Sequence, residues 1–251
     1  MTVSDFLIRW LAEYAEHRVC GLTFEAYERI VRRHLIPALG EQDLAELTSA
    51  QIQSYLHEKR CRSRLNGGGL SACTVAQHHR VLHKALVCAV DWRLLDSNPA
   101  SRVTAPRVQP RWVRVLDEEA TKQLLRSLRG HPVYLPSLIA VGTGMRRGEI
   151  LGLHWSEVDL PRRVLAVIRS LEQTSKGLAF KAPKTRRSRR LIALPGFVVH
   201  ELEQQRRHRG AEVGRVGQAE QWGVVVTRPD GAPWPPNSFS RAFGEVLRAR
   251  G

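Results

Sequence analysis

Residues 143–160 read TGMRRGEILGLHWSEVDL, a segment in which an apolar run meets a glycine turn and a second helix is predicted to begin. Gly144 allows the backbone to bend sharply there, so rigid flanking structure can aim Arg146 into a cleft. Glu149 follows three residues later, close enough on a helical turn to hold the Arg146 guanidinium. Taken alone, the pattern also fits a surface turn whose ion pair contributes little stability.

A one-sided basic run follows at Lys176–Arg190, where seven of fifteen side chains are basic and none is acidic. Between two predicted strands, such density favours a hairpin tip that enters a DNA groove, although a solvated turn is the alternative. The expected phosphate contacts are Lys181, Arg186, Arg187 and Arg189. Lys184 follows Pro183, which restricts its placement, and a fixed ammonium is suited to donate a proton to a leaving alkoxide.

The rest of the second half predicts helices and short strands. Helices are expected at 117–128, at 132–141 and from about Asn237, and strands at 164–168, 178–180, 191–194 and 224–226. The pattern is that of a helix-rich α+β domain with a small antiparallel sheet. Trp155 is more typical of a core residue than of a base-stacking platform.

The first half reads as helices throughout. An apolar stripe predicts a helix over 3–17, and Thr23 is expected to cap a second helix that stops at Pro37. Thr48 and Gln51 form a capping-box pattern, and a long helix is expected from Ser71 to about Trp92. Opposite its apolar face lies a polar ridge of Gln77, Arg80 and Lys84, which could read base edges and hold phosphate in a major groove. A solvated helix face explains the same ridge equally well.

A proline-containing stretch from Asn98 to Trp112 separates the two halves and predicts an extended linker, with the boundary near Pro106. Residues 1–106 carry a net charge of +2, and residues 107–251 carry +13. The second half therefore holds the charge that would attract a polyanion.

Over its 251 residues the chain carries a net charge of +15, which makes nucleic acid the leading candidate partner. We expect no membrane association, because no segment approaches the length of a membrane span and Asp5 and Arg9 interrupt any N-terminal apolar run. We expect a cytoplasmic protein whose four cysteines are reduced and mostly buried, and no metal, because none of them has zinc-ligand spacing.

Three ordered segments resemble the tyrosine recombinase (phage integrase) family. Residues 143–160 resemble its first-arginine motif, residues 182–195 (APKTRRSRRLIALP) its lysine-bearing β-hairpin, and residues 71–106 the end of its helical core-binding domain. The resemblance implies a mainly α, SAM-like core-binding DNA-binding domain over 1–106. Residues 107–251 would form an α+β catalytic domain with a small antiparallel sheet, partial because it is incomplete at the C-terminus.

Family members bind duplex DNA at a recombination site and attack a phosphodiester with a tyrosine. They then rejoin strands through a 3′-phosphotyrosine without metal or nucleotide cofactor. The resemblance also implies that other recombinase protomers can bind the same DNA. Arg146 matches the arginine on the scissile phosphate, Lys184 the lysine that protonates the departing 5′-oxygen, and Glu149 the supporting acid. These roles suit a bidentate guanidinium and a fixed ammonium.

The chain departs from the family in its tyrosines. In the family the second arginine and the nucleophile follow these motifs, whereas Tyr14, Tyr27, Tyr55 and Tyr134 all precede Arg146. No residue is therefore assigned as the nucleophile, and we expect DNA binding without cleavage by the chain alone. Two alternatives stay open: a stand-alone DNA-binding competitor that occupies recombination sites, and an enzyme whose missing segment comes from another chain.

Overall fold

The computed structural model describes residues 1–62, 68–110, 112, 115–182, 189–212 and 223–249. The chain divides into two compact units, Met1–Val113 and Arg114–Gly251, called here the first and second units. The expected boundary near Pro106 lies seven residues before this division. Each unit has its own hydrophobic core, so each is described by itself.

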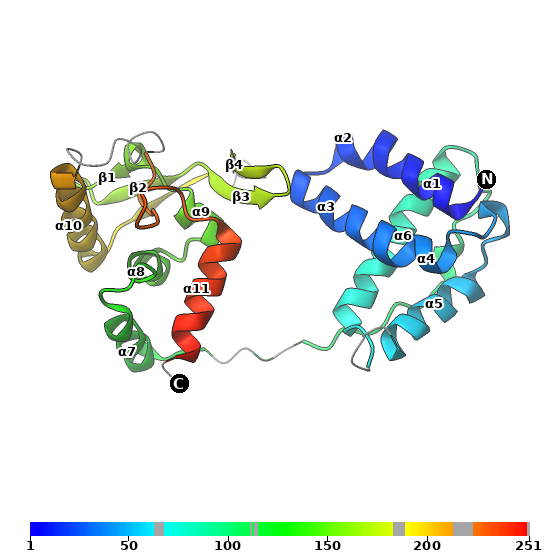
Figure 1. Ribbon diagram of the computed structural model, residues 1–251, viewed down its shortest axis with the longest axis horizontal. Coiled ribbons are helices and arrows are strands. Elements are labelled where there is room, and N and C mark those ends of the chain that lie inside the picture. Colours follow the sequence, from blue (N-terminus) through cyan, green and yellow to red (C-terminus); the bar gives the residue numbers. More distant parts are fainter. Residues whose placement is uncertain (63–67, 111, 113–114, 183–188, 213–222, 250–251) are drawn as a thin grey trace. The chain divides into compact units, whose positions relative to one another are not determined.

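The first unit is helical, as the sequence predicts (Figure 1). Its helices are α1 (Val3–Trp10), α2 (Glu16–Arg18), α3 (Gly21–Ile30), α4 (Ile36–Leu39), α5 (Ser49–Cys61) and α6 (Ala72–Asp91). π-Helical turns at Leu11–Ala15 and Val31–Leu35 connect α1 to α2 and α3 to α4. Short 3-10 turns lie at Leu44–Glu46 and Pro99–Arg102.

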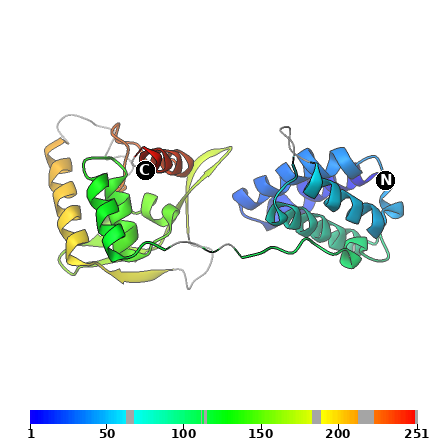
Figure 2. The same cartoon turned by 90° about the horizontal axis from the view of Figure 1, so that it is seen from below.

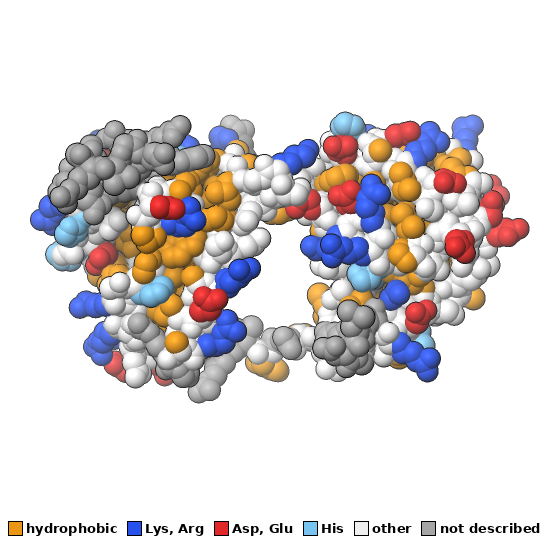
Figure 3. Space-filling view, viewed as in Figure 1, with side chains coloured by type: hydrophobic (Ala, Val, Ile, Leu, Met, Phe, Trp, Pro, Cys, Tyr) orange, Lys and Arg blue, Asp and Glu red, His pale blue; other side chains and the backbone are white. Residues whose placement is uncertain are grey.

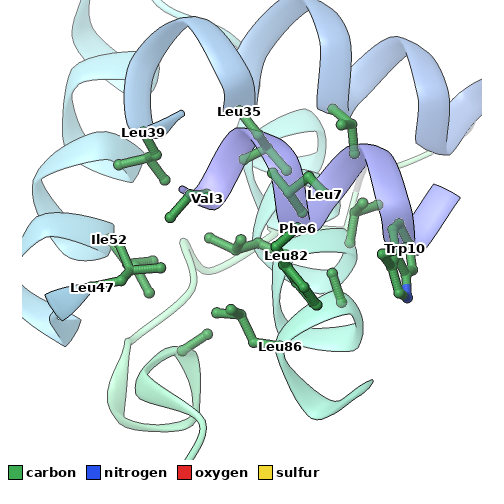
Figure 4. Close-up of a cluster of buried hydrophobic side chains, with 14 of the residues drawn as sticks. Val3, Phe6, Leu7, Trp10, Leu35, Leu39, Leu47, Ile52, Leu82 and Leu86 are labelled. Atoms are coloured by element: carbon green, nitrogen blue, oxygen red, sulfur yellow. The ribbon is translucent and has the colours of Figure 1, made fainter. Parts of the chain in front are cut away.

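The core of the first unit forms around α1 and α6. Phe6, Leu7 and Trp10 recur at helical spacing on α1 and are fully buried, as are Leu82 and Leu86 on α6. Figure 4 shows these side chains gathered in one cluster with residues of the neighbouring helices. This packing fixes α6, the helix that carries the polar ridge.

Two of the expected helix starts are confirmed and one is wrong. Thr48 and Gln51 form the reciprocal capping box, and the Ser71 hydroxyl accepts from the Thr74 backbone N–H. Thr23 caps nothing, because the helix begins one turn earlier, after Cys20. The helical path also continues past Pro37, which occupies the first turn of α4, where a missing N–H costs little.

Part of the expected linker is packed rather than extended. The Pro99 carbonyl accepts from the Ser49 hydroxyl at 2.7 Å, and the Ala100 carbonyl lies 3.0 Å from Nε2 of His79. Ala100 is fully buried against α5 and α6. These contacts make the segment to about Val103 part of the first unit.

The second unit combines helices with two small sheets, which confirms the α+β expectation. Its helices are α7 (Glu118–Leu128), α8 (Tyr134–Thr143), α9 (Arg147–Leu151), α10 (Gly196–Glu212) and α11 (Pro236–Arg248). Its strands are β1 (Val158–Asp159), β2 (Val164–Val167), β3 (Ser170–Thr174), β4 (Gly177–Lys181) and β5 (Arg190–Ala193). Asp117 caps α7, as the sequence predicts.

The strand pairing differs from the sequence prediction. β1, β2 and β5 form one antiparallel sheet, whereas β4 pairs with β3 in a separate hairpin. The basic run therefore links two sheets instead of forming the tip of a β4–β5 hairpin. The expected strand at Val224–Val226 is reduced to an isolated bridge between Val224 and His154.

The helices of the second unit lie on one face of the β1–β2–β5 sheet, as Figures 1 and 2 both show. Leu165 and Val167 of β2 are buried, and Ile192 of β5 pairs with Leu165 on this inner face. Leu191 is 75% exposed, so the other face of the sheet meets solvent. This alternation determines which side chains of β5 reach α9.

None of the described helices is long and apolar enough to cross a membrane. Within the described ranges, no group of three or more His, Cys, Asp or Glu side chains could hold a metal ion. The cysteines are free thiols, but the expectation that most are buried is wrong. Cys88 is buried, Cys20 is half-buried, and Cys61 and Cys73 are exposed.

Candidate phosphate-binding site

The predicted turn forms between α8 and α9. Gly144 ends α8 with a φ of 63°, a left-handed conformation that favours glycine. Arg146 is the N-cap of α9, and its backbone N–H donates to Oε2 of Glu149 at 2.9 Å. The side chain that the sequence singles out is thus fixed at a helix start.

Two glycines let α9 approach β3 closely. A Cβ on Gly148 would lie 2.9 Å from the Leu171 carbonyl oxygen, and one on Gly152 would lie 2.7 Å from the Leu171 backbone nitrogen. Because the two glycines are four residues apart, they share the helix face that rests on the strand. This contact determines where Arg146 and Glu149 lie.

Glu149 holds two arginines. Arg146 Nη1 donates to Oε1 of Glu149 at 3.1 Å. Arg190, the first residue of β5, donates from Nη1 to Oε1 at 3.1 Å and from Nη2 to Oε2 at 2.8 Å. The Glu149 side chain is 6% exposed, Arg190 32% and Arg146 76%. The expected Arg146–Glu149 pair is therefore present with a second, inner arginine.

Burial opposes ionisation of Glu149, yet the hydrogen bonds from Arg190 and Arg146 hold the pKa of this carboxyl below its ordinary value. The same carboxylate raises the pKa of Arg190. Glu149 is thus an anion and both arginines are cations. Two guanidinium groups around one carboxylate leave a net positive corner, with its more exposed cation at Arg146.

The sequence reasoning missed Arg190. That residue was counted in the basic run and was not assigned to the site. Strand alternation is the signal that could have found it, because Arg190 shares the inner face of β5 with Ile192, whereas Leu191 points outward. Its partner lies 41 residues away, so local spacing gives no hint of the pair.

The other predicted residues of the second unit fall into three groups. Lys184, Arg186 and Arg187 lie outside the described residues. Arg189 is exposed and precedes Arg190, which is bonded to Glu149. Lys181 ends β4 and pairs with Glu172 at 2.9 Å.

The α6 ridge lies in the first unit. Gln77 and Arg80 are exposed. Lys84 is half-buried, and its ammonium lies 5.5 Å from the centre of the Tyr27 ring. Gln77 and Arg80 thus face solvent, whereas Lys84 packs on Tyr27 of the same unit.

A second buried glutamate, Glu157, also accepts from a backbone N–H and pairs with an arginine. The backbone N–H of His154 donates to Glu157 at 3.0 Å, and Arg169 forms an ion pair with the same carboxylate. Trp155 is partly buried against the core of the second unit, which fits the structural role predicted for it. This cluster lies at the next short helical turn, Trp155–Glu157, which contacts β2.

On one face of the second unit, the described Lys and Arg side chains are dispersed. On the face drawn in Figure 3, Lys and Arg side chains of the second unit are spread over the surface rather than gathered in one patch. The Arg146–Glu149–Arg190 cluster differs from these because one buried carboxylate holds two arginines, of which Arg146 is 76% exposed. It is the described feature best suited to hold an anion at a defined position.

Comparisons with known proteins give one family model, several sequence relatives and several solved structures that this chain resembles. Residues 2–60 match the family model "Phage integrase, N-terminal SAM-like domain". The chain is 25% identical to a "Tyrosine recombinase XerC-like" protein of Caldanaerobacter subterraneus subsp. tengcongensis, over 100% of the chain and 68% of that protein. It is 26% identical to an "Integrase" of Streptomyces ambofaciens, over 98% of the chain and 63% of that protein. The chain thus spans about two thirds of the length of these relatives.

Solved structures share the fold. The Tn1549 transposon integrase in complex with transposon right end DNA matches 100% of this chain and 78% of its own, with a TM-score of 0.81 and 20% identity. A lambda integrase dimer bound to a COC' core site matches 99% of this chain and 63% of its own, with a TM-score of 0.70 and 16% identity. The matched SAM-like domain and the sequence relatives support the tyrosine recombinase (phage integrase) family for this chain, and the solved structures show that it shares their fold.

Proposed function

We propose that this chain binds duplex DNA as part of a site-specific tyrosine recombinase. In this proposal the first unit is the core-binding domain and the second unit carries the residues that contact the scissile phosphate. The observation that carries it is the Arg146 side chain, which is 76% exposed although the Arg146 backbone N–H is held by Glu149. An exposed cation on a rigid support can bind a phosphate without first being ordered.

The proposed chemistry is charge stabilisation. A planar guanidinium can donate two parallel hydrogen bonds to the non-bridging oxygens of a phosphodiester. In the family reaction these oxygens gain negative charge as the bond to the nucleophile forms, so a fixed cation lowers the barrier. Lys184 is proposed to protonate the leaving 5′-oxygen, following its match to the lysine-bearing segment of the family.

We further propose that the chain does not cleave DNA by itself, because its tyrosines serve other roles. Tyr14 and Tyr27 stack on Trp10 in the first unit. Tyr55 is 3% exposed, and burial raises its pKa, which disfavours the phenolate that would attack phosphorus. The Tyr134 hydroxyl donates to Glu201 at 3.5 Å.

The proposed partners are duplex DNA at a recombination site and other protomers on that DNA. Similar folds occur in a lambda integrase dimer bound to a COC' core site and in a lambda integrase tetramer bound to a Holliday junction. The net charge of +13 over residues 107–251 favours the same class of partner. With genomic DNA as its partner, the chain would act in the cytoplasm.

A salt series tests DNA binding. We expect the affinity of the full chain for a short random-sequence duplex, followed by fluorescence anisotropy, to fall linearly on a plot of log affinity against log salt concentration. Replacing Lys181, Arg186, Arg187 and Arg189 together by Ala should lower the slope by a few units, about one per lost phosphate contact. Lys181→Ala alone should change it less than Arg189→Ala, because Lys181 is paired with Glu172.

Binding that does not depend on salt, or no binding, would contradict the DNA-binding proposal. If the quadruple variant had the same salt slope as the wild type, the basic run would be a solvated segment that does not contact DNA. The cleavage proposal has a separate test. After incubation with nicked duplexes, denaturing gels should show no covalent protein–DNA adduct. An adduct lost in a Tyr→Phe variant would prove that one of the four tyrosines is a nucleophile.

A further inference from the structure

The two arginines on Glu149 are held unequally. Arg190 makes two side-chain hydrogen bonds to the carboxylate, at 3.1 and 2.8 Å, whereas the Arg146 side chain makes one, at 3.1 Å. We propose that Arg190 is a positioning residue that keeps the Arg146 guanidinium available to a DNA phosphate. The inference rests on the proposed role of Arg146.

The first argument concerns hydrogen-bonding capacity. A carboxylate has about four lone-pair sites. Oε1 of Glu149 accepts from the side chains of Arg190 and Arg146, and Oε2 accepts from Arg190 and from the Arg146 backbone N–H. These four bonds fill the carboxylate. Further N–H groups of Arg146 find no acceptor site left on Glu149, so they can point to an external anion.

The second argument concerns charge. A buried carboxylate is strongly destabilised when it lacks a cationic partner. Arg190 neutralises Glu149 from the inner side, at 32% exposure, which leaves the charge of Arg146 uncompensated at 76% exposure. Without Arg190, Glu149 would draw the flexible Arg146 guanidinium into a bidentate pair. The pair would be neutral and would occupy two of the five guanidinium N–H groups, so a phosphate would bind more weakly.

A set of variants separates this mechanism from a direct contact. The probe is the random-sequence duplex, and the readout is its dissociation constant at one low salt concentration. Arg190→Gln should weaken binding about tenfold, close to the effect of Arg146→Gln. Arg190→Gln added to Arg146→Gln should cause no further loss, because both act through one guanidinium. Arg207→Gln is the matched loss of one charge at an exposed position of α10 and should change binding much less.

The decisive variant is the double substitution Glu149→Gln/Arg190→Gln. It removes the carboxylate that would capture Arg146, so it should bind DNA more tightly than Arg190→Gln, although more weakly than the wild type because Glu149 also fixes the backbone of Arg146. A direct phosphate contact by Arg190 predicts instead that the double variant binds as weakly as Arg190→Gln. Circular dichroism checks the fold of each protein. If Arg190→Gln does not fold, Arg190→Lys provides the comparison, because one ammonium cannot replace both hydrogen bonds.

The outcomes distinguish the two levels of the proposal. A wild-type chain that fails to bind duplex DNA would refute the proposed function itself. Wild-type binding that falls with Arg146→Gln but not with Arg190→Gln would overturn the role of Arg190 alone. Additive losses in the Arg146→Gln/Arg190→Gln variant, or no rescue by Glu149→Gln, would overturn it too.

Discussion

His78 is a buried imidazole at the centre of α6. It is 1% exposed, its Nδ1 lies 2.9 Å from the Tyr55 hydroxyl, and its Nε2 has no hydrogen-bond partner among the described residues. Burial, with smaller effects of His34 and Lys59, lowers the pKa of His78 from 6.5 to about 4. The folded state therefore favours the neutral form of this side chain.

The buried imidazole predicts that the first unit loses stability in acid. The unfolded chain binds a proton at His78 below pH 6.5, whereas the folded chain binds it only near pH 4. Stability is thus complete above pH 6.5, and it falls by up to about 3 kcal/mol as the pH drops toward 4. Urea unfolding at several pH values, followed by circular dichroism, measures this slope.

A double substitution provides the control for the acid effect. Tyr55→Phe/His78→Leu removes both partners of the buried hydrogen bond, so it leaves no unsatisfied group at that contact. It should flatten the acid slope, leaving a smaller part from His34, whose pKa is also lowered by burial and by Lys59 and neighbouring arginines. A slope equal to that of the wild type would show that other groups cause the acid sensitivity.

The contact between α9 and β3 controls the placement of the site. Gly152→Ala would put a methyl group 2.7 Å from the Leu171 backbone nitrogen, so the helix must move. We expect a loss of about 2 kcal/mol of unfolding free energy, together with weaker DNA binding, because Arg146 shifts with α9. Urea unfolding and anisotropy measure the two effects.

Gly244→Ala is the matched substitution on α11, where an added Cβ meets no atom within 4 Å. It should leave DNA binding unchanged and raise stability by about 0.5 kcal/mol, since alanine is the better helix former. If Gly152→Ala behaved like Gly244→Ala, close packing of α9 on β3 would not determine the site.

The α6 ridge predicts a difference between its members. Gln77 and Arg80 are exposed, whereas the Lys84 ammonium lies over Tyr27. If α6 enters a major groove, Gln77→Ala and Arg80→Ala should change the ranking of sites selected from a random DNA library, and Lys84→Ala should leave it nearly unchanged. Equal losses on every sequence would refute base reading by α6.

The accuracy of the sequence predictions varied with how local the signal was. The starts of α5, α6 and α7 were correct because hydroxyl or carboxylate caps lie within three residues of the groups they satisfy. β3 was missed because Ser170-Leu-Glu-Gln-Thr174 has one strongly apolar residue. Its strand character comes from pairing with β4, which single-strand propensity does not reveal.

The site shows the same limit over a longer range. Arg146 and Glu149 were predicted together because three residues separate them, whereas Arg190 is brought to Glu149 by the pairing of β5 with β2. The alternation of β5 contained the clue. Its pairing partner did not follow from the sequence, since β4 was expected to pair with β5.

For the molecule as a whole, the uneven distribution of charge predicts that the two units contribute differently to DNA binding. With a net charge of +11 in residues 114–251 and +4 in residues 1–113, the second unit should supply most of the salt-dependent affinity and the first unit the sequence preference. A chain that acts as a competitor at recombination sites also makes a distinct prediction in the cell. Deleting it should change the recombination frequency of an intact relative, and an unchanged frequency would contradict that role.

The central claim is that the Arg146 guanidinium lies against the DNA backbone, and tethered cleavage tests it most directly. An iron chelate is attached at Arg146→Cys in a chain whose exposed Cys61 and Cys73 are replaced by Ser, with Arg207→Cys on α10 as the control position. The account predicts strong cleavage of a bound, end-labelled duplex from position 146 and little from position 207. Equal cleavage from both positions, or cleavage from position 207 alone, would contradict it.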